Sequence, residues 1–174
     1  MQDNTFALIS HNVSETKAVG AKLGHLLQAG DVVCLQGDLG SGKTSLTQGI
    51  GQGMSVTDTI NSPTFVFIRE HHSTPGTPFL NHVDLYRLEQ SRDALALGLT
   101  DYMYGDGITV IEWAERARDL MPKEFLWITF TILEDTQRNL VFKASGTRYL
   151  ALLEELRQEL LSNHSSLATP IEVM

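Results

Sequence analysis

The sequence predicts an α/β fold in which helices flank a mostly parallel sheet and an antiparallel hairpin comes late in the chain. Strand-like and helix-like segments alternate along the chain, which is the first observation behind this class. The run Val32–Leu35 is apolar at every position, as is typical of a strand buried on both faces of a parallel sheet. The segments Phe125–Leu133 and Asn139–Ala144 flank a polar turn, which indicates the hairpin.

Local patterns predict each element in order. Up to residue 53 we expect a strand at Thr5–Ser10, a helix capped by Ser14 and stopped by Gly30, a strand at Asp31–Gln36 and a helix at Lys43–Gly53. Beyond that point we expect strands at Phe65–Ile68, Phe79–Val83 and Ile108–Ile111, helices at Ser91–Leu99 and Ala114–Leu120, the hairpin, and a closing helix over Tyr149–Leu160. Serine caps a helix start by accepting a backbone N–H, and apolar residues three or four positions apart form a buried helix face.

The chain length fits a single domain with a short tail. A chain of 174 residues can bury enough apolar surface for a core without disulfides or metals. We therefore expect one domain over residues 1–162. Residues 163–174 are mostly polar and contain a proline, so we expect this C-terminal tail to be mobile.

Composition excludes several classes of protein. The net charge of -8 and the absence of a Lys/Arg run argue against direct binding to a nucleic-acid backbone. A single cysteine, Cys34, excludes an intramolecular disulfide framework and a cysteine-based zinc site. The apolar run Phe125–Leu133 is half the length that a membrane helix needs, and the N-terminus lacks a signal-peptide pattern. We expect a cytoplasmic protein that does not associate with membranes.

The strongest motif is a glycine-rich phosphate loop, GDLGSGKT, at Gly37–Thr44. A predicted buried strand precedes it and a predicted helix follows, so backbone N–H groups and the helix N-terminus can face a phosphate. Lys43 is expected to reach the outer phosphates, and the Thr44 hydroxyl to bind Mg²⁺. This makes the fold P-loop NTPase-like, with a nucleotide and Mg²⁺ as cofactors. The predicted nucleotide-binding residues of this loop are Gly37, Gly40, Ser41, Gly42, Lys43, Thr44 and Ser45.

Two acids are candidates for the rest of a Mg-nucleotide site. Asp84 and Glu112 each follow a short apolar strand, and the carboxyl ends of parallel strands share one edge of a sheet. One carboxylate is expected to hold Mg²⁺ and the other to orient or deprotonate the attacking water. The residue pattern leaves open which acid takes which role.

The segment Ser62-Pro63-Thr64 has two interpretations. Pro63 favours an extended Ser62, and the two hydroxyls can meet a γ-phosphate or a metal-bound water. P-loop proteins often place a nucleotide-sensing switch after the first helix. The alternative is a plain turn that leads into a strand.

The motifs in this sequence resemble those of the TsaE family, and the resemblance covers about residues 5–160. Four motifs carry the resemblance in the family's order: GDLGSGKT at Gly37–Thr44, SPTF at Ser62–Phe65, HVDLYR at His82–Arg87 and IEWAE at Ile111–Glu115. Each motif alone is weak, but all four in order within a short chain are specific. Members of this family are small bacterial P-loop ATPases required for making threonylcarbamoyladenosine in tRNA.

The resemblance implies roles for individual residues. It implies Glu112 as the Mg²⁺ ligand beside Thr44, and Asp84 as the essential catalytic acid. It favours the switch reading of Ser62, Pro63 and Thr64. It implies that Trp113 lies near the nucleotide, and it matches Arg138 to an arginine common in the family's hairpin turn. For Arg138 a phosphate or partner contact and a solvated side chain remain equal alternatives.

The resemblance also implies partners. The family acts with TsaB and TsaD, so this chain is expected to bind ATP, dock on the TsaB–TsaD complex, and hydrolyse ATP to reset the complex between turnovers. Contact with tRNA is then indirect, through the partners, which fits the acidic composition. Two other functions stay open: a small-molecule kinase of the P-loop class, and a nucleotide-gated binding module with negligible turnover.

Overall fold

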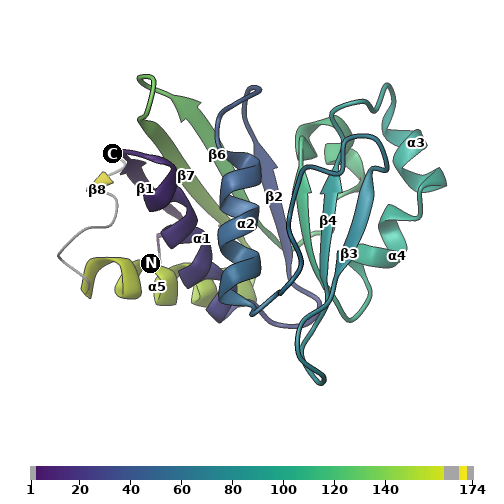
Figure 1. The fold of residues 1–174 in the computed structure, drawn as a ribbon, viewed down its shortest axis with the longest axis horizontal. Helices are drawn as coiled ribbons and strands as arrows, with labels where there is room; N and C mark the ends of the chain where they lie inside the picture. Colours follow the sequence, from purple (N-terminus) through teal and green to yellow (C-terminus); the bar gives the residue numbers. More distant parts are fainter. Residues whose placement is uncertain (1–2, 163–168, 172–174) are drawn as a thin grey trace.

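The computed structural model describes residues 3–162 and 169–171, whose eight strands form one sheet (Figure 1). The order across the sheet is β3-β4-β5-β2-β6-β7-β1-β8. Four neighbouring strands run parallel: β4 (Leu80–Asp84), β5 (Ile108–Glu112), β2 (Val32–Gln36) and β6 (Phe125–Ile132). The others pair antiparallel: β3 (Ile68–His71), β7 (Arg138–Ser145), β1 (Thr5–Ser10) and β8 (Thr169–Ile171). The predicted class, with its parallel central sheet and the late β6–β7 hairpin, is confirmed.

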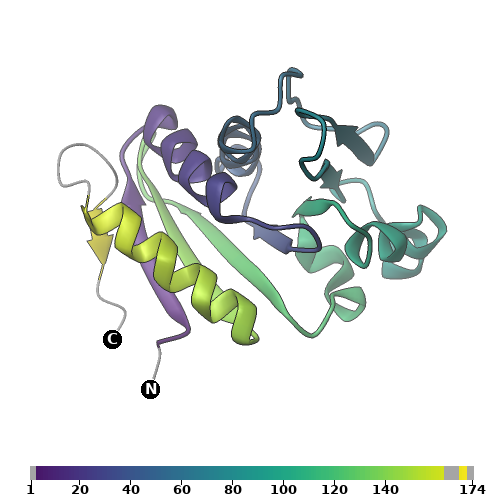
Figure 2. The same cartoon turned by 90° about the horizontal axis from the view of Figure 1, so that it is seen from below.

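Helices cover both faces of this sheet. They are α1 (Val13–Leu26), α2 (Lys43–Gly53), α3 (Ser91–Ala96), α4 (Leu99–Met103), the 3₁₀ helix η1 (Ala114–Leu120) and α5 (Thr147–Ser162). Along β2, Val33 and Leu35 pack in the core with α1, α2 and α5, whereas Val32 and Cys34 pack in the core with α3, α4 and η1. Figure 2 shows α1 and α5 beside the β1–β7 half of the sheet. The apolar run of β2 is therefore buried on both faces, as predicted.

Helices α1 and α2 touch through their main chains. A Cβ on Gly49 of α2 would lie 2.1 Å from the carbonyl oxygen of Lys17 in α1. A Cβ on Gly24 of α1 would lie 2.3 Å from the carbonyl oxygen of Ile50 in α2. Any larger side chain at either glycine would therefore force the two helices apart. This contact fixes α1 against the helix that follows the glycine-rich loop.

Most element bounds agree with the sequence pattern, and α2 agrees at both ends. Helix α1 differs, because Asn12 and not Ser14 is its N-cap: the Asn12 side chain accepts a 2.9 Å hydrogen bond from the Glu15 backbone N–H. Helix α1 also ends at Leu26, before Gly30. Gly30 instead takes a positive φ of 89° in the turn that enters β2.

The strand predicted at Phe65–Ile68 is wrong, since β3 begins only at Ile68. The backbone N–H groups of Val66 and Phe67 both donate to the Pro63 carbonyl, which bends the chain, and Phe67 takes a φ of 64°. The helix predicted at Ser91–Leu99 is split into α3 and α4 at Gly98, which has a φ of 79°. Turn hydrogen bonds to the Pro63 carbonyl and positive φ values at Phe67 and Gly98 therefore overrode the predicted pattern here.

The C-terminal tail is described in part. Thr169–Ile171 forms β8, which pairs antiparallel with β1. The mobility predicted for the tail otherwise falls on residues 163–168 and 172–174, which lie outside the described residues, so it stays a prediction. Within the described part of the chain, the helices are too short or too polar to cross a bilayer.

Candidate functional site

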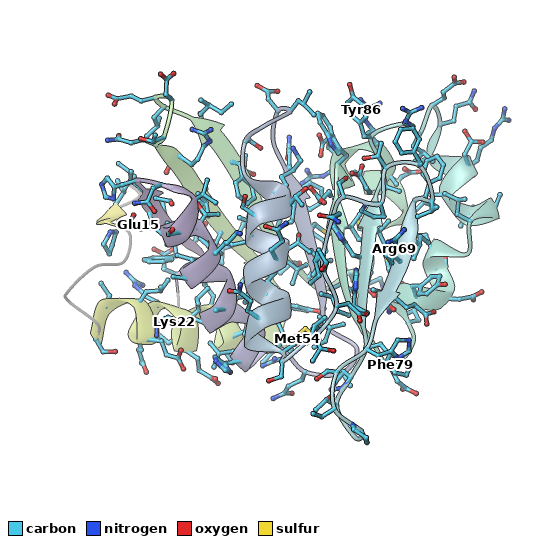
Figure 3. All side chains as sticks on the ribbon, in the orientation of Figure 1. Glu15, Lys22, Met54, Arg69, Phe79 and Tyr86 are labelled. Carbon is cyan, nitrogen blue, oxygen red and sulfur yellow. The ribbon has the colours of Figure 1, made fainter. Side chains whose placement is uncertain are left out.

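A cavity of about 680 Å³ opens at the carboxyl ends of β2, β4 and β5. Figure 3 shows Tyr86 at this edge of the sheet, whereas Met54 and Phe79 lie at the opposite edge. Predicted site residues that line the cavity are Gly40, Ser41, Gly42, Lys43, Thr44, Ser45, Ser62, Thr64, Asp84, Glu112, Trp113 and Arg138. Gly37 and Pro63 belong to the same loops but do not line it. The structure thus brings five separate stretches of the sequence to one concave site.

The glycine-rich loop presents backbone donors to this cavity. Gly40 and Gly42 take positive φ values of 76° and 107°, which side-chain-bearing residues rarely adopt. Gly42 is also the N-cap of α2, and no described side chain caps this helix start. The first N–H groups of α2 therefore lack a side-chain acceptor and lie at the positive end of the helix dipole, an arrangement that suits an anion.

Lys43 places its positive charge inside the loop. Its Nζ donates to the carbonyl oxygens of Gly37 and Asp38, at 2.6 and 2.9 Å, and lies 4.3 Å from the centre of the Trp113 ring. Burial lowers the pKa of Lys43, and the nearby carboxylates, Glu112 first, act in the opposite direction. The ammonium group thus lies beside the anion-facing N–H groups of α2.

Thr44 and Glu112 form a direct pair. The Thr44 hydroxyl donates a 2.8 Å hydrogen bond to Glu112 Oε1. Glu112 is the last residue of β5 and is 2% exposed, so its carboxylate is held at the cavity wall rather than in bulk water. The two side chains supply hydroxyl and carboxylate oxygens, the ligand types that Mg²⁺ prefers.

Asp84 lies directly beside Glu112 and belongs to a separate hydrogen-bond cluster. It ends β4, and the parallel register pairs it with Glu112. Asp84 Oδ2 accepts from the hydroxyls of Ser62 and Thr64, the latter at 3.0 Å. Its Oδ1 accepts a 2.9 Å hydrogen bond from the Tyr86 backbone N–H. The segment at Ser62–Thr64 therefore binds the Asp84 carboxylate directly.

Trp113 turns the chain at the end of β5. It takes a left-handed conformation, with a φ of 59°, and it is the N-cap of η1. Its half-buried ring packs on Tyr86, with 5.0 Å between ring centres, and on the Lys43 ammonium. The indole therefore lies against Lys43 of the glycine-rich loop, and its predicted place beside a nucleotide stays a prediction.

Arg138 links the β6–β7 turn to the glycine-rich loop. Its guanidinium donates to the carbonyl oxygens of Glu134 and Asp135 within the turn, and across to that of Gly40 at 3.2 Å. The side chain is thus tied to backbone at the cavity rim rather than freely solvated. The structure places Arg138 in the cavity lining, and a phosphate or partner contact of this side chain stays a prediction.

Several cavity residues were not predicted. The N-terminus of α1 contributes Asn12 and Thr16, and the hairpin turn contributes Asp135 and Thr136. Asn12 carried a helix-cap signal, but nothing in the sequence places α1 beside the glycine-rich loop, because that follows from the glycine contacts with α2. His82 is part of the HVDLYR motif, from which no role for it was predicted, and it contacts Glu112.

Glu115 is a further acid near the loop. Burial raises its pKa, and Lys43 and Arg116 act in the opposite direction. Its Oε2 has no hydrogen-bond partner among the residues that the structure describes. Glu115 does not line the cavity, but it is an acid near Lys43 whose charged form is disfavoured by burial.

The parallel central sheet, the loop between β2 and α2, and the site at the carboxyl edge define a P-loop NTPase-like α/β protein. Comparison with known proteins gives the family. Residues 10–140 match the family model for the threonylcarbamoyl adenosine biosynthesis protein TsaE. The chain therefore belongs to the TsaE family, which acts in tRNA threonylcarbamoyladenosine biosynthesis.

Individual relatives agree with this membership. A tRNA threonylcarbamoyladenosine biosynthesis protein TsaE from Bacillus subtilis is 40% identical over 153 residues, which cover 87% of this chain and 94% of the relative. A TsaE from Nostoc sp. is 50% identical over 127 residues, covering 71% and 76% of the two chains. The crystal structure of Bacillus subtilis YdiB is similar with a TM-score of 0.76 at 34% identity, and the similarity covers 89% of this chain and 95% of that chain.

Proposed function

We propose that this protein is a Mg²⁺-dependent ATPase that serves tRNA threonylcarbamoyladenosine biosynthesis by resetting a TsaB–TsaD complex between turnovers. The observation that carries the proposal is the Thr44–Glu112 hydrogen bond of 2.8 Å, with Asp84 in register beside it. A hydroxyl at a phosphate-loop helix and a carboxylate at the next parallel strand form the usual Mg-nucleotide arrangement.

The glycine-rich loop is the proposed nucleotide-binding segment. The phosphates of ATP or ADP would accept from the N–H groups at the start of α2, with Lys43 and Arg138 supplying positive charge. Thr44 and Glu112 would hold Mg²⁺, which neutralises charge on the phosphate oxygens when bound. Trp113 would pack close to the nucleotide, because it already packs on Lys43.

Asp84 is the candidate for activating water. As water attacks the γ-phosphorus, the bond to the bridging oxygen breaks, and ADP and phosphate leave. Asp84 would orient that water and take its proton. The hydroxyls of Ser62 and Thr64 donate to Asp84 Oδ2. These hydrogen bonds would have to break before Asp84 Oδ2 could accept one from the attacking water.

Partner binding is supported by charge and by exposed apolar groups. The chain carries a net charge of -8, which disfavours direct contact with tRNA and leaves that contact to TsaB–TsaD. Leu39 of the glycine-rich loop is 72% exposed and Phe65, next to the switch, is 80% exposed. Large apolar side chains exposed beside a site suit contact with another protein.

One observation also favours the second candidate, a nucleotide-gated binding module. Both oxygens of Asp84 already accept hydrogen bonds from this chain. In such a module Asp84 would hold the switch and would not act on water. Asp84→Ala distinguishes the two functions, because ATP hydrolysis requires the Asp84 carboxylate to act on the attacking water and nucleotide-gated binding does not.

The first test is Mg-ATP hydrolysis by the purified protein, alone and with added TsaB–TsaD complex. We expect the complex to raise the rate, and Asp84→Ala to lower the stimulated rate by about 100-fold or more while ATP still binds. Equal hydrolysis by the variant and the natural protein would contradict the role of Asp84. Binding without stimulation would favour the module, and phosphate transfer to a small-molecule acceptor would favour a kinase.

A further inference from the structure

We propose that His82 is a positioning residue that fixes the Glu112 carboxylate for Mg²⁺, an inference that rests on the proposed metal role of Glu112. His82 Nε2 lies 2.5 Å from Glu112 Oε2. Both side chains are buried, His82 completely so. An ionised carboxylate can only accept a hydrogen bond, so the imidazole N–H is the donor.

Strand register explains why these two side chains meet. In the parallel β4–β5 pair, His82 is opposite Val110 and Asp84 is opposite Glu112. Because side chains alternate along a strand, His82 and Asp84 share one face of the sheet, and Val110 and Glu112 share the same face. His82 therefore lies beneath Glu112, on the side away from the cavity opening.

The two oxygens of Glu112 are held separately. Oε1 accepts from the Thr44 hydroxyl and Oε2 accepts from His82. Because each oxygen of Glu112 has its own donor, the carboxylate plane cannot rotate freely. The lone pairs that remain for Mg²⁺ therefore point in a fixed direction. Hydrogen bonds of this kind behind a metal-binding carboxylate set its orientation and its metal affinity.

Packing alone does not account for an imidazole at this position. His82 Nδ1 is buried and has no hydrogen-bond partner among the described residues. An apolar side chain of similar size would fill the space without burying an unpaired nitrogen. The polar contact that the imidazole does make is the one to Glu112.

His71 offers a matched control. It is 1% exposed, and its ring centre lies 6.5 Å from that of His82. Its Nδ1 lies 3.5 Å from Asp58 Oδ2, and β4 separates its strand, β3, from β5, which carries Glu112. Substitution of His71 disturbs the same packed region while leaving the donor to Glu112 in place.

The test compares two amides of different reach, His82→Gln and His82→Asn. The glutamine amide reaches the position of imidazole Nε2, whereas the asparagine amide reaches only that of Nδ1. ADP affinity is measured by calorimetry with Mg²⁺ and with EDTA, and the ratio of the two affinities is the Mg²⁺ gain. We expect His82→Asn to reduce this gain about tenfold or more, with the EDTA affinity unchanged. His82→Gln should retain most of the gain, and His71→Asn should retain all of it.

The outcomes separate this inference from the proposed function. Glu112→Gln should abolish the gain, and adding His82→Asn to it should cause no further loss. If Glu112→Gln keeps the gain, the metal role of Glu112 is wrong whatever His82 does. If Glu112→Gln loses the gain while His82→Asn keeps it, the positioning role alone is overturned. Should His82→Asn fail to fold, His82→Leu provides the donor-free variant; failure of both to fold while His82→Gln folds would overturn the positioning role in favour of a structural one.

Discussion

At the scale of single residues, the site depends on polar side chains that form hydrogen bonds between different elements. The Thr44–Glu112 pair joins α2 to β5, and the Ser62–Asp84 pair joins the Ser62–Thr64 segment to β4. The sequence predicted that both acids lie at the site because each follows an apolar strand, and the structure places both in the cavity lining. The sequence could not identify the Glu112–His82 contact, because a register of parallel strands cannot be read from one strand alone.

Lys43 provides a prediction at this scale. Lys43→Ala removes the ammonium group beside the N-terminus of α2, so we expect ADP affinity to fall about 100-fold, the loss of one charge-assisted contact. Calorimetric titration with ADP measures the effect. Lys22→Ala, on α1 and outside the cavity, is the matched control that removes the same charge. Equal affinities for Lys43→Ala and the natural protein would contradict a phosphate contact.

At the scale of elements, the pattern located helices and strands well where local sequence decides them. The bounds of α2 follow from the loop motif and the glycines that end it, and the burial of β2 follows from its apolar run. The turn at Phe65–Phe67 was missed because hydroxyl contacts to Asp84 and a positive φ decide it. The N-terminus of α1 was missed as part of the site because a contact between two helices puts it there.

The anchoring of α5 to the sheet gives a prediction of pH dependence. The Tyr149 hydroxyl accepts a 2.7 Å hydrogen bond from the Val32 backbone N–H, and burial raises the pKa of Tyr149 to about 12. The folded protein therefore holds this proton more tightly than the unfolded chain, whose tyrosine titrates near pH 10. The contribution of protonated Tyr149 to the free energy of unfolding is fully present below about pH 10, and it is lost as the pH rises towards 12.

Urea unfolding of the natural protein and of Tyr149→Phe measures this effect. Between pH 10 and 12 we expect the free energy of unfolding of the natural protein to fall by about 2–3 kcal/mol more than that of the variant. At pH 8 the variant should be the less stable of the two, because its Val32 N–H loses the acceptor. Parallel pH profiles for the two proteins would show that Tyr149 does not titrate in this way.

At the scale of the whole molecule, the cavity is lined by segments that are far apart in the sequence. The N-terminus of α1, the glycine-rich loop, the Ser62–Thr64 segment and the β6–β7 turn all contribute. A ligand that fills the cavity therefore contacts segments that are held together only in the folded protein. Nucleotide binding should accordingly stabilise the fold as a unit and not just one loop.

Thermal unfolding tests this expectation. At a free Mg-ADP concentration of about 100 times its Kd, binding adds about 2.7 kcal/mol, which raises the Tm of a protein of this size by roughly 5–10 °C. Differential scanning calorimetry with and without Mg-ADP gives the shift, and Lys43→Ala at the same concentration should show almost none. A similar rise in Lys43→Ala would place the stabilising ligand outside the glycine-rich loop.

The glycine contacts between α1 and α2 have a consequence for the dimensions of the site. Side chains usually absorb small changes between packed helices by changing rotamer, but here carbonyl oxygens meet Cα atoms and nothing can rotate. The gap between the start of α1 and the start of α2 is therefore a property of two rigid main chains. Substitutions on the outer surfaces of these helices can alter charge and solubility, but they leave the width of the cavity at that wall unchanged.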